Sequence, residues 1–336
     1  YNRHYYLLRS IKYWSRFCFR VIYVDGSDNS LNIPFKLNSN ITYIHSPVSF
    51  AKRLQQCVPL LNTPYCALLC DDEFYLPAGL NQSINFLNSN SAYVSCIGRS
   101  IGFRSSECPH VYSSVYPGFH DRNLSSNNHI ERLVCHFSNY APSHFYSVIR
   151  SDVFKSTLLS SLAFKVDVYA LFELIFEFLV VANGKSCVIP CLHWLRSFDA
   201  KAIRNNGELG FTTTKSFSNW WFSKTAANER SAFCNYLSKS TQNLVSPKEV
   251  YEIFSNYVAK SPSPKRTPKR IFDYLISSLL SSLPLNIKAL LKRMVRIVFP
   301  GMLRLKSDQA ISDLVRQKVY IDSNELDLCL QIMANK

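Results

Sequence analysis

Apolar and polar residues follow two rhythms along the first part of the chain, one typical of helices and one typical of strands. Apolar side chains recur at helical spacing in 4–17, 50–61, 79–90 and 168–182, which predicts four helices. Short runs rich in β-branched and aromatic residues predict strands between them. These runs are 19–24, 41–45, 65–70, 92–99, 144–150 and 186–192. The alternation predicts an α/β fold in which helices flank a mixed sheet.

The pattern changes in the second part of the chain, where strand signals fade beyond about residue 225. Residues 261–270 are basic and interrupted by prolines, which is typical of a linker. Residues 271–302 carry Leu and Ile on one side of a predicted helix and Lys and Arg on the other. We therefore expect an α/β domain over 1–225 and a basic helical C-terminal region over 226–336. The weak pattern of 104–132 predicts a long loop.

Composition narrows the possible partners. The formal net charge is +15, and residues 246–306 hold twelve basic and three acidic residues, a net charge of +9. A nucleic acid, an anionic membrane surface or a phosphorylated substrate would each suit such a stretch. A helical subdomain with a solvated basic side explains it equally well. No nucleic-acid-binding motif is present, so we expect no nucleic acid as partner.

Cysteine and glycine usage excludes several classes of protein. The eleven cysteines form no CxxC pair, which argues against a disulfide framework and favours the reducing cytoplasm. The nine glycines build neither GxGxxG nor GxxxxGK[ST], so neither of these phosphate-binding loops is expected. No run of 18 apolar residues occurs. We expect a cytoplasmic protein that can bind the inner face of the membrane through its basic C-terminal helices.

Three consecutive acidic residues, Asp71, Asp72 and Glu73, follow the apolar run 65–70. Like charges so close together raise one another's pKa, and a divalent cation relieves that cost. An ordinary solvated turn is the alternative interpretation, and the three residues alone do not decide between the two.

The surroundings of these acids favour the metal site. Tyr1-Asn2-Arg3 before a helix, VIYVDGSD at 21–28 and CDDEFYLPAGL at 70–80 together resemble the family-2-type GT-A glycosyltransferases, in particular a bacterial branch that makes cell-surface polysaccharides. The resemblance covers about 1–200 and implies a GT-A, Rossmann-like sheet. It also implies that a strand precedes Tyr1 in a longer protein.

The resemblance assigns roles to individual residues. It implies that Tyr1 and Arg3 bind the nucleotide, that Asp25 binds the base and that Lys52 also contacts the nucleotide. Asp71 is expected at the ribose, and Asp72 and Glu73 are expected to bind Mg²⁺ or Mn²⁺. Cys70 stands where the family commonly has the first acid of its DxD motif, and this leaves the division of roles among the three acids open. Arg53, next to Lys52, opens the same helix; a solvated helix face is the alternative for both residues, and it is favoured more for Arg53 than for Lys52.

A second group of polar residues lies between 167 and 196. Counted back from Gly184, Glu173 takes the place of the family's catalytic base, with Asp167 as the second choice. A partly exposed structural acid is the alternative for Glu173, and Glu177 is expected to be a structural neighbour. His193 is expected at the metal or diphosphate, against the alternative of a buried core histidine. Arg196 can clamp a phosphate.

The expected activity is metal-dependent transfer of a sugar, with inversion, from a nucleoside diphosphate to a hydroxyl. The donor is expected to be a UDP-sugar and the acceptor a polysaccharide or lipid-linked glycan. A GT-A-fold protein without catalysis and a basic nucleic-acid- or membrane-binding module are the alternatives. The histidines at 110, 120, 129, 136 and 144 lack metal-site spacing and are interpreted as loop composition.

Overall fold

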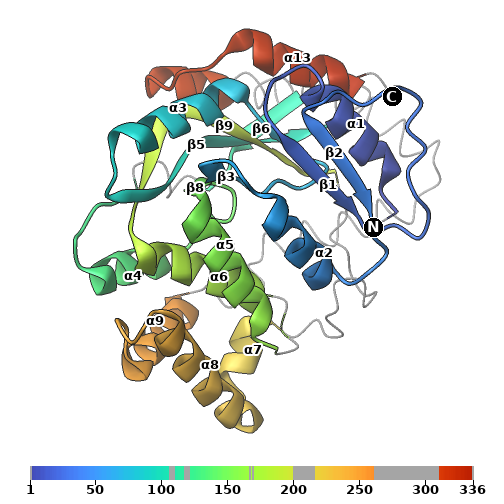
Figure 1. Ribbon diagram of the computed structural model, residues 1–336. Coiled ribbons are helices and arrows are strands. Elements are labelled where there is room, and N and C mark those ends of the chain that lie inside the picture. The colour runs from blue at the N-terminus through green and yellow to red at the C-terminus, as the bar shows by residue number, and fades with distance from the viewer. Residues whose placement is uncertain are drawn as a thin grey trace, which may run out of the picture.

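The fold is known from a computed structural model that describes residues 2–105, 110–116, 122–165, 168, 170–199, 216–260 and 310–334. Its centre is a mixed β-sheet with helices on both faces (Figure 1). The predicted α/β class, with its mixed sheet flanked by helices, is therefore confirmed.

The main sheet has seven strands and is built around two long ones, β5 (Tyr93–Arg104) and β9 (Lys185–Ser197), which run parallel to each other. Its order is β3-β8-β5-β9-β4, with β6 paired to β5 and β7 paired to β9. All pairings other than β5–β9 are antiparallel. The shorter strands are β3 (Tyr65–Cys66), β4 (Phe74–Tyr75), β6 (His110–Ser114), β7 (Asn123–Leu124) and β8 (Val148–Arg150).

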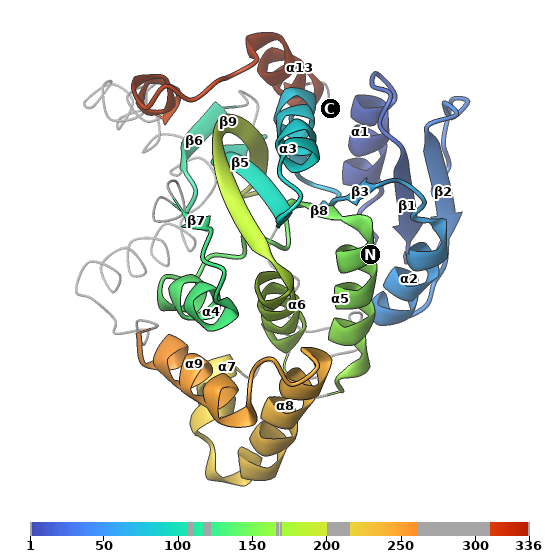
Figure 2. The same ribbon diagram turned by 60° about the vertical axis from the view of Figure 1, so that its left-hand side comes forward.

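A second, two-stranded sheet carries the N-terminal part of the chain. Its strands, β1 (Val21–Asp25) and β2 (Ile41–His45), are parallel and pair in register from Val21–Ile41 to Asp25–His45. Helices α1 (His4–Trp14) and α2 (Phe50–Cys57) lie beside it, and the short η1 (Val58–Leu60) continues α2 (Figure 2).

Helices cover both faces of the main sheet. Helix α3 (Pro77–Ser89) packs on β5 and β9 on one side, and α5 (Ser151–Ala163) and α6 (Ala170–Asn183) lie on the other (Figures 1 and 2). Helix α6 is apolar on nearly all sides, which suits its position between the sheet and a further helical layer.

That further layer has an apolar core of its own. Helices α4 (His129–Ser138), α7 (Phe217–Phe222), α8 (Ala227–Ser240) and α9 (Pro247–Lys260) pack with α6, and η3 (Lys224–Ala226) joins α7 to α8. Phe137, Phe178, Phe233 and Phe254 are fully or almost fully buried among them. Helix α6 thus contributes to both cores, because Phe172, Phe176 and Val180 belong to the core under the sheet.

The last described segment, 310–334, packs on the first core rather than on α7–α9. Leu314, Leu326 and Cys329 are buried in the same cluster as Ile11 and Trp14 of α1. The carboxylate of Glu325, on α13 (Ser323–Ala334), accepts hydrogen bonds from the Ala78 backbone N–H at 2.9 and 3.0 Å. It thereby caps the N-terminus of α3, where backbone N–H groups lack partners within the helix. The region 226–336, expected as one C-terminal unit, therefore packs in two places: α8 and α9 lie against α6, and 310–334 lies against α1.

Most predicted elements are present, with shifted ends. The strand predicted at 65–70 is formed only at Tyr65–Cys66, and the chain that carries the acids is irregular. The loop predicted over 104–132 is wrong in part, because β6, β7 and the start of α4 fall within it. Helix α5 was not predicted, since its Ser- and Thr-rich sequence hides the apolar spacing. The predicted linker 261–270 and helix 271–302 lie outside the described residues. None of the described helices is both long enough and apolar enough to span a bilayer.

Candidate functional site

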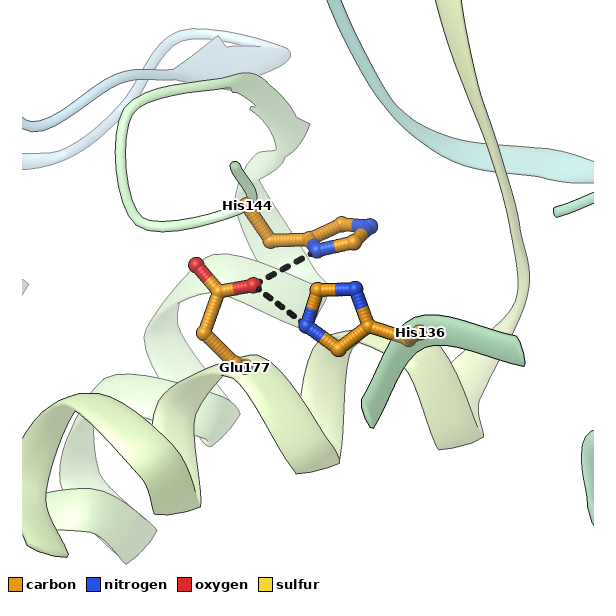
Figure 3. A group of neighbouring side chains, drawn as sticks. All are labelled: His136, His144 and Glu177. Carbon is orange, nitrogen blue, oxygen red and sulfur yellow. Dashed lines mark hydrogen bonds and ion pairs between the residues drawn. The ribbon is translucent and has the colours of Figure 1, made fainter. Parts of the chain in front are cut away.

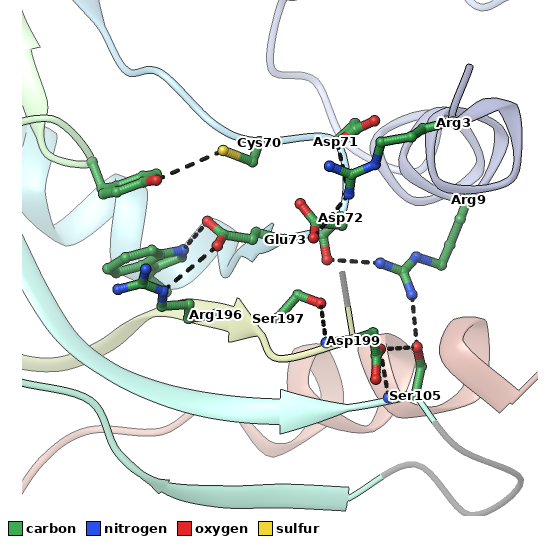
Figure 4. Close-up of polar contacts among 12 residues, drawn as sticks. Arg3, Arg9, Cys70, Asp71, Asp72, Glu73, Ser105, Arg196, Ser197 and Asp199 are labelled. Atoms are coloured by element: carbon green, nitrogen blue, oxygen red, sulfur yellow. Dashed lines mark hydrogen bonds and ion pairs between the residues drawn. The ribbon is translucent and has the colours of Figure 1, made fainter. Parts of the chain in front are cut away.

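The acidic residues lie on an irregular segment, 67–73, between β3 and β4. Strand β4 pairs with β9 so that Phe74 lies opposite Leu195 and Tyr75 opposite Trp194. This pairing brings Glu73 to the side chains of β9: Trp194 Nε1 donates to Glu73 Oε2 at 2.9 Å, and Arg196 Nε lies 4.0 Å from Oε1 (Figure 4).

Cys70, Asp72 and Glu73 form a compact group of metal-ligand types. One ligand atom of each lies within 4.8 Å of the other two, and Asp72 and Glu73 are only 6% exposed. Burial raises the pKa of Glu73 to about 8, and the charge of Asp72 adds to this effect. A divalent cation at this group would relieve both the burial and the repulsion. The side chains present therefore fit the Mg²⁺ or Mn²⁺ that the sequence predicted.

Two arginines from the start of the chain neutralise part of this charge. Arg3 Nη2 lies 3.2 Å from Asp71 Oδ1 and 2.9 Å from Asp72 Oδ2. Arg9, one turn into α1, donates to the Asp72 carbonyl at 2.7 Å and to Ser105 Oγ at 3.2 Å (Figure 4). Arg3, Asp71 and Asp72, all predicted site residues, are thus brought together.

Asp25 lies at the end of β1 and is tied to the same N-terminal segment. Its carboxylate accepts hydrogen bonds from the Ser27 N–H at 2.9 Å, the Ser27 hydroxyl at 2.6 Å and the Tyr43 hydroxyl at 2.9 Å. Burial alone would raise the pKa of Asp25, but these bonds and nearby His4 hold it below its usual value. Asn2 bonds the neighbouring Ser27 through its backbone N–H, so residues 2–4 join the Asp25 turn to the acidic segment.

The basic residues of α2 differ from expectation. Lys52 is exposed, whereas Arg53 is buried and donates to the Val48 carbonyl at 2.7 Å. The expectation that Arg53 lies on the solvated face is wrong: its guanidinium covers Gly26, where an added Cβ would lie 1.7 Å from Arg53 Nη1. Arg53 therefore faces the turn after β1, while no described contact joins Lys52 to the site.

His193 lies on the opposite face of β9 from the acidic group. Side chains alternate along a strand, so Trp194 and Arg196 face Glu73 and His193 faces α3. There its Nδ1 lies 3.3 Å from Ser83 Oγ, and burial lowers its pKa to about 4. Among the described residues, two groups of side chains could bind a metal ion, Cys70–Asp72–Glu73 and His136–His144–Glu177, and His193 is in neither. Tyr1 and Asp167, two further predicted site residues, lie outside the described part of the chain.

Glu173 lies in the first turn of α6 and has a single described hydrogen-bond partner. The Tyr140 hydroxyl donates to Glu173 Oε1 at 2.6 Å. Burial raises the pKa of Glu173 to about 7; the charge of Glu177 raises it further, and the bond from Tyr140 lowers it. A carboxylate that titrates near neutral pH suits a general base.

Tyr146 contacts the acidic segment. Its hydroxyl lies 3.7 Å from Cys70 Sγ, and its ring stacks on Trp194 with centroids 4.1 Å apart. Burial raises the pKa of Tyr146, and the charges of both Glu73 and Glu173 add to the rise. Tyr146 thus packs against Cys70 and Trp194 at the acidic segment, and among the described contacts none joins it to Glu173.

A third polar group, His136, His144 and Glu177, was not predicted from the sequence. Glu177 Oε2 lies 3.0 Å from His136 Nε2 and 2.7 Å from His144 Nδ1 (Figure 3). All three side chains are at most 4% exposed. Interpretation of these two histidines as loop composition is wrong, because His136 lies on α4 and both are buried. The only available signal was an acid, Glu177, on an otherwise apolar helix, which requires a buried partner.

This third group resembles a metal centre, but its hydrogen bonds oppose one. Arg122 Nη1 lies 3.2 Å from His136 Nδ1, and a guanidinium can only donate. His136 therefore carries its hydrogen on Nε2, the atom that faces Glu177 and would have to bind the metal. Burial lowers the pKa of His136 to about 4, so its ring is neutral. The arrangement is a buried polar network in which His136, His144 and the Phe145 N–H surround Glu177, and Arg122 lies behind His136.

A wide surface hollow of about 720 Å³ is lined by residues 15–18 and 36–40 and includes none of the site residues above, so we assign it no role in the site.

Comparisons of the chain with protein-family models and with curated proteins find no match.

Proposed function

We propose that the chain is a metal-dependent glycosyltransferase that moves a sugar from a nucleoside-diphosphate donor to a hydroxyl of a polysaccharide or lipid-linked glycan. The observation that carries the proposal is the compact Cys70–Asp72–Glu73 group of possible metal ligands, which Arg3 contacts; Glu173 is the carboxylate that we assign to the acceptor. Sugar transfer needs a cation at the diphosphate and a base at the attacking hydroxyl, and these groups provide ligands for one and a carboxylate for the other.

The role that we propose for each of these residues follows from its charge. Asp72 and Glu73 would hold Mn²⁺ or Mg²⁺, which stabilises the negative charge of the departing diphosphate. The carboxylate oxygens of Asp72 and Glu73 suit both cations, whereas burial raises the pKa of the Cys70 thiol and keeps it a poor ligand. Arg3 and Arg196 contact the carboxylates and are placed to bind phosphate oxygens once the cation takes over those carboxylates. Glu173 accepts the proton of the acceptor hydroxyl, which supports an inverting displacement.

Calorimetric titration of UDP with and without Mn²⁺ tests this proposal. We expect binding that depends on Mn²⁺ and that weakens at least about tenfold in Asp72→Ala and Asp72→Asn. Asp313→Ala is the matched control, since the one described ion pair of Asp313 is with Arg316 on the surface, and we expect it to bind like the wild type. If UDP, GDP, CDP and dTDP all fail to bind the folded wild-type protein with Mn²⁺ present, the proposal is wrong.

We place the enzyme in the cytoplasm, at the inner face of the membrane. The basic, amphipathic sequence of 271–302 supports this location, since each Lys or Arg near an anionic surface contributes about 1 kcal/mol. We expect the protein to sediment with vesicles that contain anionic lipid at low salt, and not with neutral vesicles. Equal behaviour with both kinds of vesicle would refute the location at the membrane.

A further inference from the structure

We infer that Tyr140 is the positioning residue of Glu173, and that the network around Glu177 holds the segment that carries Tyr140. The catalytic meaning of this inference rests on the proposed function, but the contact itself does not. Two carboxylates, Glu173 and Glu177, lie one helical turn apart on α6, and the segment 136–145 contacts both.

The segment 136–145 meets α6 at two successive turns. Glu177 Oε2 lies 3.0 Å from His136 Nε2 and 2.7 Å from His144 Nδ1. Glu177 Oε1 accepts a hydrogen bond from the Phe145 N–H at 2.7 Å. His144 is held from its other side by Ser186 Oγ on β9, 2.8 Å from Nε2. Both ends of the segment are thereby fixed to one residue of α6.

Tyr140 lies between these two fixed ends. Its ring contacts those of His136 and Phe137 at centroid distances of 5.5 and 5.7 Å, and that of Tyr257 on α9 at 5.1 Å. A ring held on three sides has little freedom at χ1 and χ2, so its hydroxyl is directed at Glu173 Oε1. Because both ends of the segment are held at Glu177, the contacts around Glu177 also fix the position of Tyr140 along α6.

The two carboxylate oxygens of Glu173 therefore have different roles. Oε1 is occupied by Tyr140, and no other described residue bonds this carboxylate, so Oε2 remains to accept a proton. The titratable groups that act on Glu173 from the packed elements are Tyr140 and Tyr146 of the 136–146 stretch and Glu177 of α6 itself. Tyr140 is the one that stabilises the carboxylate, because its O–H donates to the charged form.

The test is the titration of the Glu173 carboxyl in the full chain. Glutamate carboxyl carbons are labelled with ¹³C and followed by NMR, and Glu173 is identified by the signal missing in Glu173→Gln. We expect Tyr140→Phe to raise the pKa of Glu173 by about one unit, since a hydrogen bond to a charged group is lost. In the proposed reaction, the acid limb of the pH–rate profile should move upward by the same amount.

Tyr236→Phe is the matched control. It also removes a partly buried tyrosine hydroxyl bond of 2.6 Å, to the Ser160 carbonyl, and Tyr236 has no described bond to Glu173. We expect it to leave the Glu173 titration unchanged. An unchanged or lowered pKa in folded Tyr140→Phe overturns the inference, whether or not the protein binds nucleotide. A raised pKa in a protein that binds no nucleotide supports the contact and refutes only the proposed function.

Discussion

Glu177→Gln is expected to destabilise the fold by about 3–5 kcal/mol in urea denaturation, the usual cost of removing one partner of a buried charge pair. The substitution keeps the size of the side chain but removes the charge that faces His136 and His144, with Arg122 in contact with His136 from behind. These partners come from α4, the turn before β8 and the segment before β7, so several elements lose a shared anchor.

The same network makes stability depend on pH with a definite sign. Burial alone would raise the pKa of Glu177, but His144 and His136 lower it to about 2, below its ordinary value of 4.5. That stabilisation is complete above about pH 4.5 and is lost as the pH falls toward 2. His136 is buried and neutral, and its pKa is lowered from 6.5 to about 4. As the pH falls from 6.5 to 4, His136 is protonated in the unfolded chain but not in the folded one. The free energy of unfolding therefore decreases further over this range.

Glu252→Gln is the control for this substitution. Glu252 is 58% exposed on α9 and lies 3.9 Å from Lys248, so we expect a change within about 0.5 kcal/mol. We also expect the wild type to lose stability more steeply than Glu177→Gln between pH 4.5 and 2. A loss below 1 kcal/mol in Glu177→Gln at pH 7 would contradict the network.

Glu173→Gln is expected to lower sugar transfer by about 10²–10⁴-fold while nucleotide binding stays within about twofold, since a general base typically contributes that factor. The amide cannot take a proton from the acceptor, but it can still accept the hydrogen bond from Tyr140. Single-turnover rates with the donor that binds most tightly, together with calorimetric affinities, would separate the two effects.

The pH dependence provides a second check on Glu173. Because the pKa of Glu173 is raised to about 7, we expect the wild-type rate to fall about tenfold per pH unit below 7. Glu173→Gln should lose this acid limb. Glu131→Gln, on the exposed surface of α4, should retain both the rate and the limb. Wild-type turnover in Glu173→Gln would exclude Glu173 as the base and leave Asp167 as the other predicted choice.

The fold was predictable where local patterns decide it. Strands β1, β2, β5 and β9 and helices α1, α3 and α6 follow from apolar spacing, because each buries one continuous stripe or run. Strands β4, β6 and β7 were missed because they are short and form by pairing with β5 or β9, which the local sequence does not encode. The packing of 310–334 on α1 joins residues that are far apart in sequence, and no local pattern predicts such a contact.

The site was predictable in its residue types and less so in its geometry. The acids 71–73 stand out after an apolar run, and their roles and that of Glu173 come from the resemblance; the compact Cys70–Asp72–Glu73 group suits the role proposed for it. His193 was assigned from its distance to Gly184, but the alternation of side chains along β9 directs it toward α3. His136 and His144 could not be linked to Glu177, because the link depends on how α4 packs on α6.

The burial of α13 against α1 has a consequence for how the protein is made. The helix that starts with His4 reaches its full set of partners only when Cys329 and Met333 have been synthesised, about 300 residues later. At about 5–20 residues per second, a ribosome needs roughly 15–60 s for that interval. During this time the apolar face of α1 lacks those partners, so the nascent chain offers chaperones a binding surface that the finished protein hides.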